Sequence, residues 1–136
     1  MPEGINQLRI GTAFLNGFVN NGLPRIPNTF QDTFILKTEI IEVKDKPSAP
    51  YELSADFFDN IDLRKRAIVA VGKQDTDVRF MYPIDERLEM IGMNSDHFVI
   101  NITGSENDYA AGDTISFILD YDAMLRVMTS EHVRKE

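Results

Sequence analysis

Alternating apolar and polar residues dominate the chain from residue 33 onward, and this pattern predicts β-strands. Residues 33–43 are rich in β-branched side chains, and their alternation slips between Ile40 and Ile41, which indicates a β-bulge. A continuous apolar run within residues 64–72 predicts a strand that is buried on both faces. Shorter strands are expected over residues 87–93, 97–103 and 114–119. Together these segments predict a sheet of mostly antiparallel strands.

The connections between these strands are polar or rich in proline. Residues 44–60 contain Pro47 and Pro50 and form a long excursion of the kind that often carries function. Residues 104–113 are a polar loop with an Ala-Gly-Asp turn signal. After the last strand, apolar residues recur at helical spacing, which predicts a short C-terminal helix through Tyr121, Met124, Leu125 and Met128.

The first 31 residues have a different pattern of residue types. Residues 5–11 resemble a strand that ends in glycine, and residues 12–17 have a helical composition that also stops at a glycine. Turn-forming residues fill the segment 19–31, which we interpret as a linker. The predicted fold class is therefore mainly β: a small antiparallel barrel or sandwich of about five or six strands, with a short strand and helix before it and a short helix after it.

Composition narrows the range of functions. A chain of 136 residues and 15.5 kDa has the size of one domain. Its net charge of −8 would repel a phosphate backbone, so nucleic acid is not an expected partner. No apolar run reaches the roughly 20 residues that a membrane-spanning helix needs. There is no cysteine and no basic, apolar leader at the start, so we expect a cytoplasmic protein.

Several motifs that could carry chemistry favour ordinary structural roles. The basic run at residues 64–66 is typical of a solvated strand edge, although it could form a phosphate patch. Asp75 and Asp77 have the spacing of a calcium loop but lack its glycine and terminal glutamate. His97 has only one other histidine and no cysteine to help it bind zinc, so no metal site is predicted.

The junction at Gly11 leaves two interpretations open. A glycine between a strand and a helix leaves backbone N–H groups at the helix N-terminus, which is a geometry that binds anions. Such junctions are also common as simple packing elements, and composition alone favours that reading.

Five blocks of sequence, taken in order, resemble the C-terminal part of the alanine racemase superfamily, and most closely its ornithine racemase-like branch. They are residues 5–13 with Asn16 and Gly17, then 36–50, 64–75, 91–97 and 112–130. Members of this superfamily have a (β/α)8 barrel that binds pyridoxal 5′-phosphate, followed by a β domain that covers the active site of the partner subunit in a head-to-tail dimer.

This resemblance implies a domain division. Residues 1–18 would be the last strand and helix of a truncated barrel, residues 19–31 a linker, and residues 32–136 the C-terminal β domain. The lysine that binds the cofactor covalently lies near the first barrel strand in the family, and no segment here matches it. We therefore expect this chain to be a piece of a longer enzyme and to be inactive alone.

The resemblance also implies site residues. Arg9 matches the arginine that hydrogen-bonds the pyridine nitrogen of the cofactor, and Gly11 and Thr12 match the backbone that binds its phosphate. Tyr121 matches a tyrosine whose hydroxyl reaches the same phosphate. Without the resemblance, Tyr121 would be an ordinary aromatic residue at the end of a strand.

The second acid/base group and the substrate contacts depart from the best-known family pattern. Alanine racemases place a catalytic tyrosine in the loop that corresponds to residues 51–60, but the expected Gly-Tyr-Gly is absent. Asp56 is a candidate for that role, and Tyr51 is a displaced alternative. Ser95 and Asp96 stand where a Met-Asp pair meets the substrate carboxylate, and the smaller serine is consistent with a longer substrate such as ornithine.

Two functions therefore remain at this point. The first is a fragment of a pyridoxal-phosphate-dependent racemase that interconverts L- and D-amino acids as a homodimer. The alternative is a non-catalytic β-barrel module for interaction or ligand binding.

Overall fold

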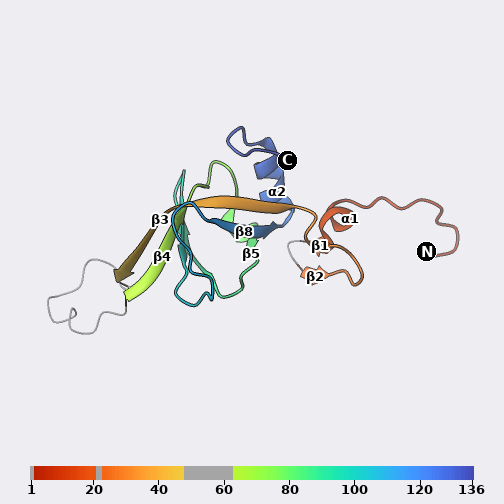
Figure 1. Ribbon diagram of the computed structural model, residues 1–136. Helices are drawn as coiled ribbons and strands as arrows, with labels where there is room; N and C mark the ends of the chain where they lie inside the picture. The colour runs from red at the N-terminus through yellow and green to blue at the C-terminus, as the bar shows by residue number, and fades with distance from the viewer. Residues whose placement is uncertain (1, 21–22, 48–62) are drawn as a thin grey trace.

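The computed structural model describes residues 2–20, 23–47 and 63–136, and its strands form one large and one small sheet (Figure 1). The N-terminal part contains helix α1 (Thr12–Asn16) and strands β1 (Phe18–Asn20) and β2 (Leu23–Arg25). The main part contains β3 (Ile35–Pro47), β4 (Leu63–Val69), the 3₁₀ turn η2 (Val78–Phe80), β5 (Met81–Pro83), β6 (Glu89–Met93), β7 (Phe98–Asn101), β8 (Thr114–Leu119) and helix α2 (Tyr121–Thr129).

The large sheet has six antiparallel strands in the order β5-β8-β3-β4-β7-β6. Strand β3 is long enough to serve two neighbours, because residues up to Glu39 pair with β8 and residues from Ile40 onward pair with β4. The register shifts between Ile40 and Glu42, which confirms the predicted bulge. The bulge bends β3, and the sheet curls into a half-barrel (Figure 1). This architecture confirms the predicted mainly β, barrel-like class.

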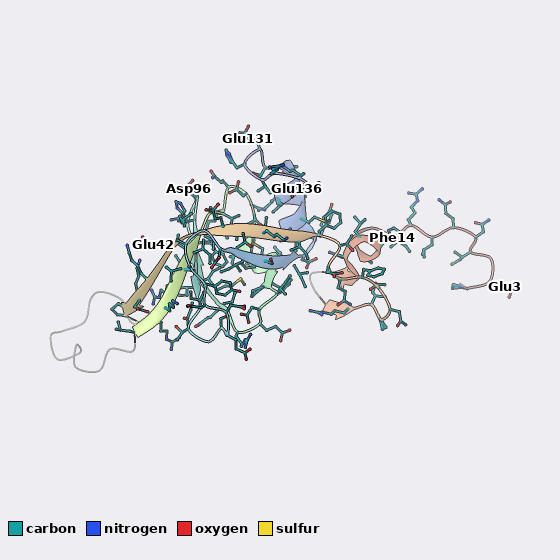
Figure 2. All side chains as sticks on the ribbon, in the orientation of Figure 1. Glu3, Phe14, Glu42, Asp96, Glu131 and Glu136 are labelled. Carbon is teal, nitrogen blue, oxygen red and sulfur yellow. The ribbon has the colours of Figure 1, made fainter. Side chains whose placement is uncertain are left out.

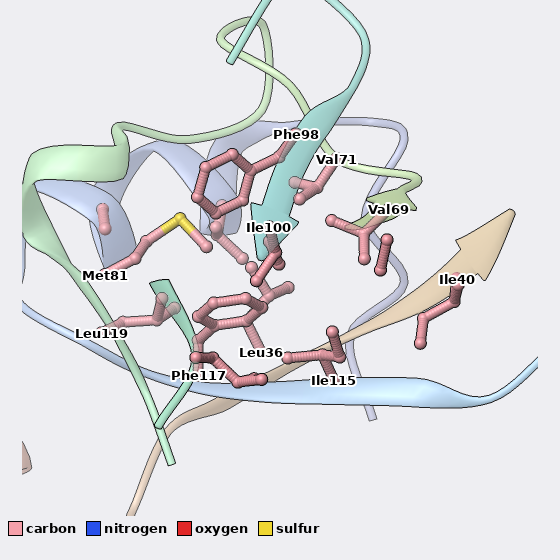
Figure 3. Close-up of a cluster of buried hydrophobic side chains, with 14 of the residues drawn as sticks. Leu36, Ile40, Val69, Val71, Met81, Phe98, Ile100, Ile115, Phe117 and Leu119 are labelled. Atoms are coloured by element: carbon pink, nitrogen blue, oxygen red, sulfur yellow. The ribbon is translucent and has the colours of Figure 1, made fainter. Parts of the chain in front are cut away.

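The core fills the inner face of this curled sheet (Figure 3). Phe98 of β7 and Phe117 of β8 are fully buried, with ring centroids 6.2 Å apart. Full burial of each ring stabilises the fold by about 1.5–3 kcal/mol. Helix α2 closes the core with Ala123, Met124 and Val127, which share one face because Val127 follows the other two by four and three positions. The alternation predicted for residues 97–103 is confirmed, since Phe98, Ile100 and Ile102 are all buried.

Strand β4 is buried on one face only, so the prediction of burial on both faces is wrong. Ala67 and Val69 are fully buried, whereas Ile68 is only partly buried and Ala70, which follows the strand, is exposed. The reason is that β4 pairs with β3 and β7 in a sheet whose core lies on a single face. The continuous apolar run therefore does not correspond to a strand covered on both sides.

Residues 5–11, which resemble a strand in sequence, do not form one in this structure. Residues 5–11 have no regular secondary structure, and the segment extends away from the sheet (Figure 1). Ile5, Leu8 and Ile10 are at least half exposed. A strand needs a neighbour to pair its backbone N–H and C=O groups, and the described residues offer none here.

The helix predicted over residues 12–17 is confirmed by α1. It ends at Gly17, which has a left-handed φ of 69° and whose N–H donates to the carbonyl of Ala13. The segment predicted as a linker, 19–31, is more structured than expected. Most of the β1-β2 ladder lies within it, with Phe18 opposite Arg25 and Asn20 opposite Leu23.

The predicted excursion over residues 44–60 starts later than expected. Residues 44–47 continue β3 and pair with β4. The rest of the excursion, including Tyr51 and Asp56, lies outside the described residues.

Candidate functional site

The N-terminal residues that the family resemblance assigns to the cofactor form an open surface. Arg9 and Gly11 are exposed, and a Cβ atom added at Gly11 would meet no atom within 4 Å. Gly11 precedes α1, which has five residues and no side-chain cap at its N-terminus. A helix this short has only a weak dipole. Thr12 is the first residue of this helix.

Tyr121 occupies a defined position at the start of α2. The carboxylate of Asp120 accepts a 2.6 Å hydrogen bond from the backbone N–H of Tyr121, and Asp120 is 1% exposed. Burial raises the pKa of the neighbouring Tyr82, and the charge of Asp120 raises it further. Tyr121 is 46% exposed, so the residue is accessible from outside the half-barrel.

Ser95 and Asp96 lie in the tight turn between β6 and β7. The side-chain oxygen of Asn94 accepts hydrogen bonds from the N–H groups of Asp96 (2.9 Å) and His97 (2.6 Å). The hydroxyl of Ser95 donates to Oδ2 of Asp96 at 2.6 Å. The turn therefore presents an exposed carboxylate whose orientation is held by local hydrogen bonds.

The loop after β4 packs against this turn and is joined to it by backbone hydrogen bonds. The N–H of Lys73 donates to the carbonyl of Asn94 (2.9 Å), and the N–H of Gln74 donates to the carbonyl of Ser95 (3.1 Å). Gly72 is packed so closely that an added Cβ atom would overlap the backbone of Ser95 and Asp96. Only glycine fits this contact without displacing the turn.

The same loop contains a buried carboxylate, Asp75, which the sequence indicated only as part of the discounted calcium motif. Asp75 is 4% exposed, and its oxygens accept hydrogen bonds from the hydroxyl of Ser130 (2.7 Å) and the N–H of Gly72 (3.4 Å). No local pattern could have indicated the bond to Ser130, because 55 positions separate the two residues.

Asp77, the other carboxylate of the discounted calcium motif, pairs with a cation instead. The guanidinium of Arg79 lies 2.6 Å from Oδ2 of Asp77 and lowers the pKa of that carboxyl to about 2. Groups of three or more metal-ligating side chains are absent from the part of the chain that the structure describes.

The basic run at residues 64–66 makes local contacts. Arg64 pairs with Glu89 (3.3 Å), Lys65 pairs with Asp108 (2.9 Å), and Arg66 donates to the carbonyl of Pro47 (2.9 Å). These contacts agree with a structural role for the run, but the interpretation as a strand edge is wrong, because β4 pairs with both β3 and β7.

An open pocket of about 530 Å³ lies between the turn at residues 84–87 and the loop at residues 107–109, over Thr114 and Ser116 of β8. Its main charged groups are already paired. Oδ1 of Asp85 accepts from Arg87 at 3.0 Å, Oδ2 accepts from Ser105 at 2.6 Å, and Arg87 also lies 2.6 Å from Glu106. The hydrogen bond from Ser105, together with Arg87, lowers the pKa of Asp85.

The structure joins some of the predicted site residues and separates others. Ser95 and Asp96 touch each other, and α2 holds Tyr121 on the same β domain. The segment that carries Arg9 and Gly11 extends away from both, and Phe14 on α1 lies well apart from Asp96 in Figure 2.

A cation, backbone amides and a phenol suit pyridoxal phosphate in their chemistry. In the described residues, however, these groups do not meet around a common cavity.

No helix in the described ranges is long and apolar enough to cross a membrane. The chain matches no model of a known protein family. It is 41% identical to an ornithine racemase from Acetoanaerobium sticklandii over 143 aligned positions, which cover 100% of this chain and 40% of that protein. It is also 41% identical to a lysine racemase from Thermotoga maritima over 145 positions, which cover 99% of this chain and 40% of that protein. The chain thus spans about 40% of the length of these curated relatives. The resemblance of this chain to the ornithine racemase-like branch of the alanine racemase superfamily is therefore confirmed.

Proposed function

We propose that this chain is the C-terminal β domain, with a short preceding segment, of an amino-acid racemase that uses pyridoxal 5′-phosphate. The observation that carries the proposal is the identity of 41% to two racemases along essentially the whole chain. Two relatives are both named as amino-acid racemases and are matched over the same share of their length. This agreement favours a role in a racemase over that of an unrelated binding module.

The exposure of the N-terminal segment supports a division into domains. Ile5, Leu8 and Ile10 would lie in the last strand of a (β/α)8 barrel, where neighbouring strands would bury them. In this division residues 1–18 belong to the barrel, residues 19–31 connect the domains, and residues 32–136 form the β domain. The cofactor-binding lysine would lie in the barrel.

Arg9, Gly11, Thr12 and Tyr121 are the residues that we propose for cofactor binding. Arg9 would donate to the pyridine nitrogen, and because a guanidinium retains its protons it would leave that nitrogen unprotonated. The backbone of Gly11 and Thr12 and the hydroxyl of Tyr121 would bind the phosphate. When bound, the cofactor withdraws electrons from the substrate and makes its Cα proton acidic.

Racemisation needs an acid/base group on each side of the substrate Cα. We propose that Asp56, or alternatively Tyr51, supplies one of these groups from the β domain of a partner subunit in a homodimer. Ser95 and Asp96 would contact the substrate from the same domain. Both relatives are named for amino acids with a cationic side chain, so we propose ornithine or lysine as substrates.

The test is to purify the whole protein with its cofactor and to incubate it with L-ornithine, L-lysine or L-alanine. Chiral chromatography should show the D-enantiomer forming from ornithine or lysine faster than from alanine. The matched control is a variant of the whole protein that lacks the cofactor-binding lysine. If no D-amino acid forms from any of the three substrates while the cofactor is bound, the proposal is wrong.

A further inference from the structure

Asp75 is a buried carboxylate to which the proposed chemistry gives no role. It is 4% exposed and is held by two hydrogen-bond donors, the hydroxyl of Ser130 and the N–H of Gly72. Burial of a carboxylate is costly unless donors surround it. Asp75 lies in the loop after β4 and bonds to Ser130 at the end of α2. A buried carboxylate in this place is suited to fixing the position of the loop relative to the helix.

The first of these segments is the loop after β4, which is hydrogen-bonded to the turn at residues 94–97. The N–H groups of Asp75 and Thr76 both donate to the carbonyl of Gly72, so residues 72–76 form a tight hydrogen-bonded loop next to the turn. Lys73 and Gln74, which lie between Gly72 and Asp75, donate their N–H groups to the carbonyls of Asn94 and Ser95 in that turn. Any movement of this loop would therefore displace Ser95 and Asp96.

The second segment is the C-terminal end of α2. Ser130 is the residue that caps this helix, and its N–H donates to the carbonyl of Arg126 at 2.9 Å. Its hydroxyl accepts from the N–H of His132 at 3.1 Å while donating to Asp75. Tyr121 lies at the other end of the same nine-residue helix. A helix of this length is a rigid rod of about 13 Å.

We propose that Asp75 is a positioning residue, which fixes the Ser95–Asp96 turn relative to α2 and therefore relative to Tyr121. Its catalytic consequence rests on the proposed function, in which Ser95 and Asp96 contact the substrate and Tyr121 contacts the cofactor phosphate. In that setting Asp75 holds the two contacts at a constant separation although it touches neither ligand.

The first test needs no enzymatic activity. Amide hydrogen exchange at Ser95, Asp96 and His97 is measured by NMR in this 136-residue chain and in its Asp75→Ala and Asp75→Asn variants. Asp75→Ala should speed exchange at these amides by about tenfold. Asp75→Asn keeps an acceptor for Ser130 and should restore most of the protection.

Thr76→Val is the matched control. Thr76 is a neighbour of Asp75 in the same loop and is 1% exposed, and its buried hydroxyl has no hydrogen-bond partner among the residues that the structure describes. Replacing an unpaired hydroxyl with a methyl group should leave exchange in the turn unchanged. If Asp75→Ala prevents folding, Ser130→Ala removes the same hydrogen bond from the other side and should give the same tenfold change.

The second test uses the whole enzyme. Asp75→Ala should raise KM for the amino acid by about tenfold and change kcat by less than about threefold, because the turn would bind substrate less well. Asp75→Asn should recover most of the loss, and Thr76→Val should match the parent.

The positioning role of Asp75 and the proposed racemase function can be refuted separately. If the parent enzyme racemises amino acids but Asp75→Ala and Ser130→Ala match Thr76→Val in both exchange and KM, Asp75 is not a positioning residue. If the parent does not racemise, the proposed function fails, whereas the exchange measurement still decides whether Asp75 fixes the turn.

Discussion

Oδ1 of Asp120 accepts a hydrogen bond of 2.6 Å from the backbone N–H of Tyr121, the first residue of α2. Asp120 is buried at 1% exposure, and its own N–H donates to the carbonyl of Phe80. The residue that we propose for phosphate binding is therefore anchored to the core by its buried neighbour.

Replacement of Asp120 should destabilise the β domain, and the loss should be smaller when the new side chain can still accept a hydrogen bond from Tyr121. Asp120→Ala removes the N-cap acceptor and should lower the free energy of unfolding by about 1–2 kcal/mol. Asp120→Asn keeps an acceptor oxygen and should cost less. Urea unfolding followed by circular dichroism measures both effects, and equal losses in the two variants would contradict a role for this hydrogen bond.

Gly72 and Gly92 form a matched pair for testing the packing of the turn. An added Cβ atom at Gly72 would overlap the backbone of Ser95, whereas at Gly92 it would meet no atom within 4 Å. Gly72→Ala should therefore lower the free energy of unfolding by at least about 2 kcal/mol. Gly92→Ala should change it by less than about 0.5 kcal/mol. If urea unfolding found both variants equally stable, the close contact between Gly72 and the turn would be refuted.

The contrast between local and distant features explains what the sequence could predict. The bounds of the strand at residues 114–119 and the bulge after Ile40 follow from alternation and its interruption, and both were predicted correctly. Strand β5 was missed because its three residues, Met81–Pro83, are too few to show a period and end in proline. The bond between Ser130 and Asp75 exists only because the fold brings α2 onto the loop after β4.

The same contrast applies to the candidate site. The Ser95–Asp96 pair is local, so the family resemblance could indicate it from consecutive residues, and its contact with substrate stays a prediction. Whether Arg9 approaches Tyr121 depends on strand partners that the described residues do not contain. A pattern of residues can predict that a strand is possible, but the strand forms only where a neighbour pairs its backbone.

The ion pair between Asp77 and Arg79 predicts a specific acid dependence. Asp77 has a pKa of about 2 in the folded chain against an ordinary value of 3.8. Its contribution to stability is therefore complete above about pH 4 and is lost as the pH falls toward 2. We expect about 1 kcal/mol, less than the pKa change alone implies, because the side chain of Arg79 is 73% exposed and solvent screens the pair.

Thermal unfolding between pH 2 and pH 7 checks this prediction in the parent and in Asp77→Asn. The variant should be less stable at pH 7, and the difference should shrink as the pH falls from about 4 to 2. A difference that stayed constant over this range would show that the charge of Asp77 contributes nothing.

Tyr121→Phe in the whole protein should weaken cofactor binding without unfolding the domain. Tyr121 is 46% exposed, so loss of its hydroxyl should leave stability nearly unchanged. Loss of one hydrogen bond to a charged phosphate corresponds to about 1.5–3 kcal/mol, so the Kd for pyridoxal phosphate should rise roughly ten- to a hundredfold. Fluorescence titration measures this Kd, and a change of less than twofold would remove Tyr121 from the proposed site.

The most direct test of the racemase proposal is exchange of the substrate Cα proton with solvent. The whole protein is incubated with L-ornithine in D2O, and the Cα proton is followed by NMR in parallel with the 136-residue chain at the same concentration. We predict that the whole protein incorporates deuterium at Cα of both enantiomers and that the 136-residue chain incorporates none, because we expect the cofactor-binding lysine to lie outside it. Retention of the Cα proton with ornithine and with lysine in the presence of the whole, cofactor-loaded protein would contradict the proposal.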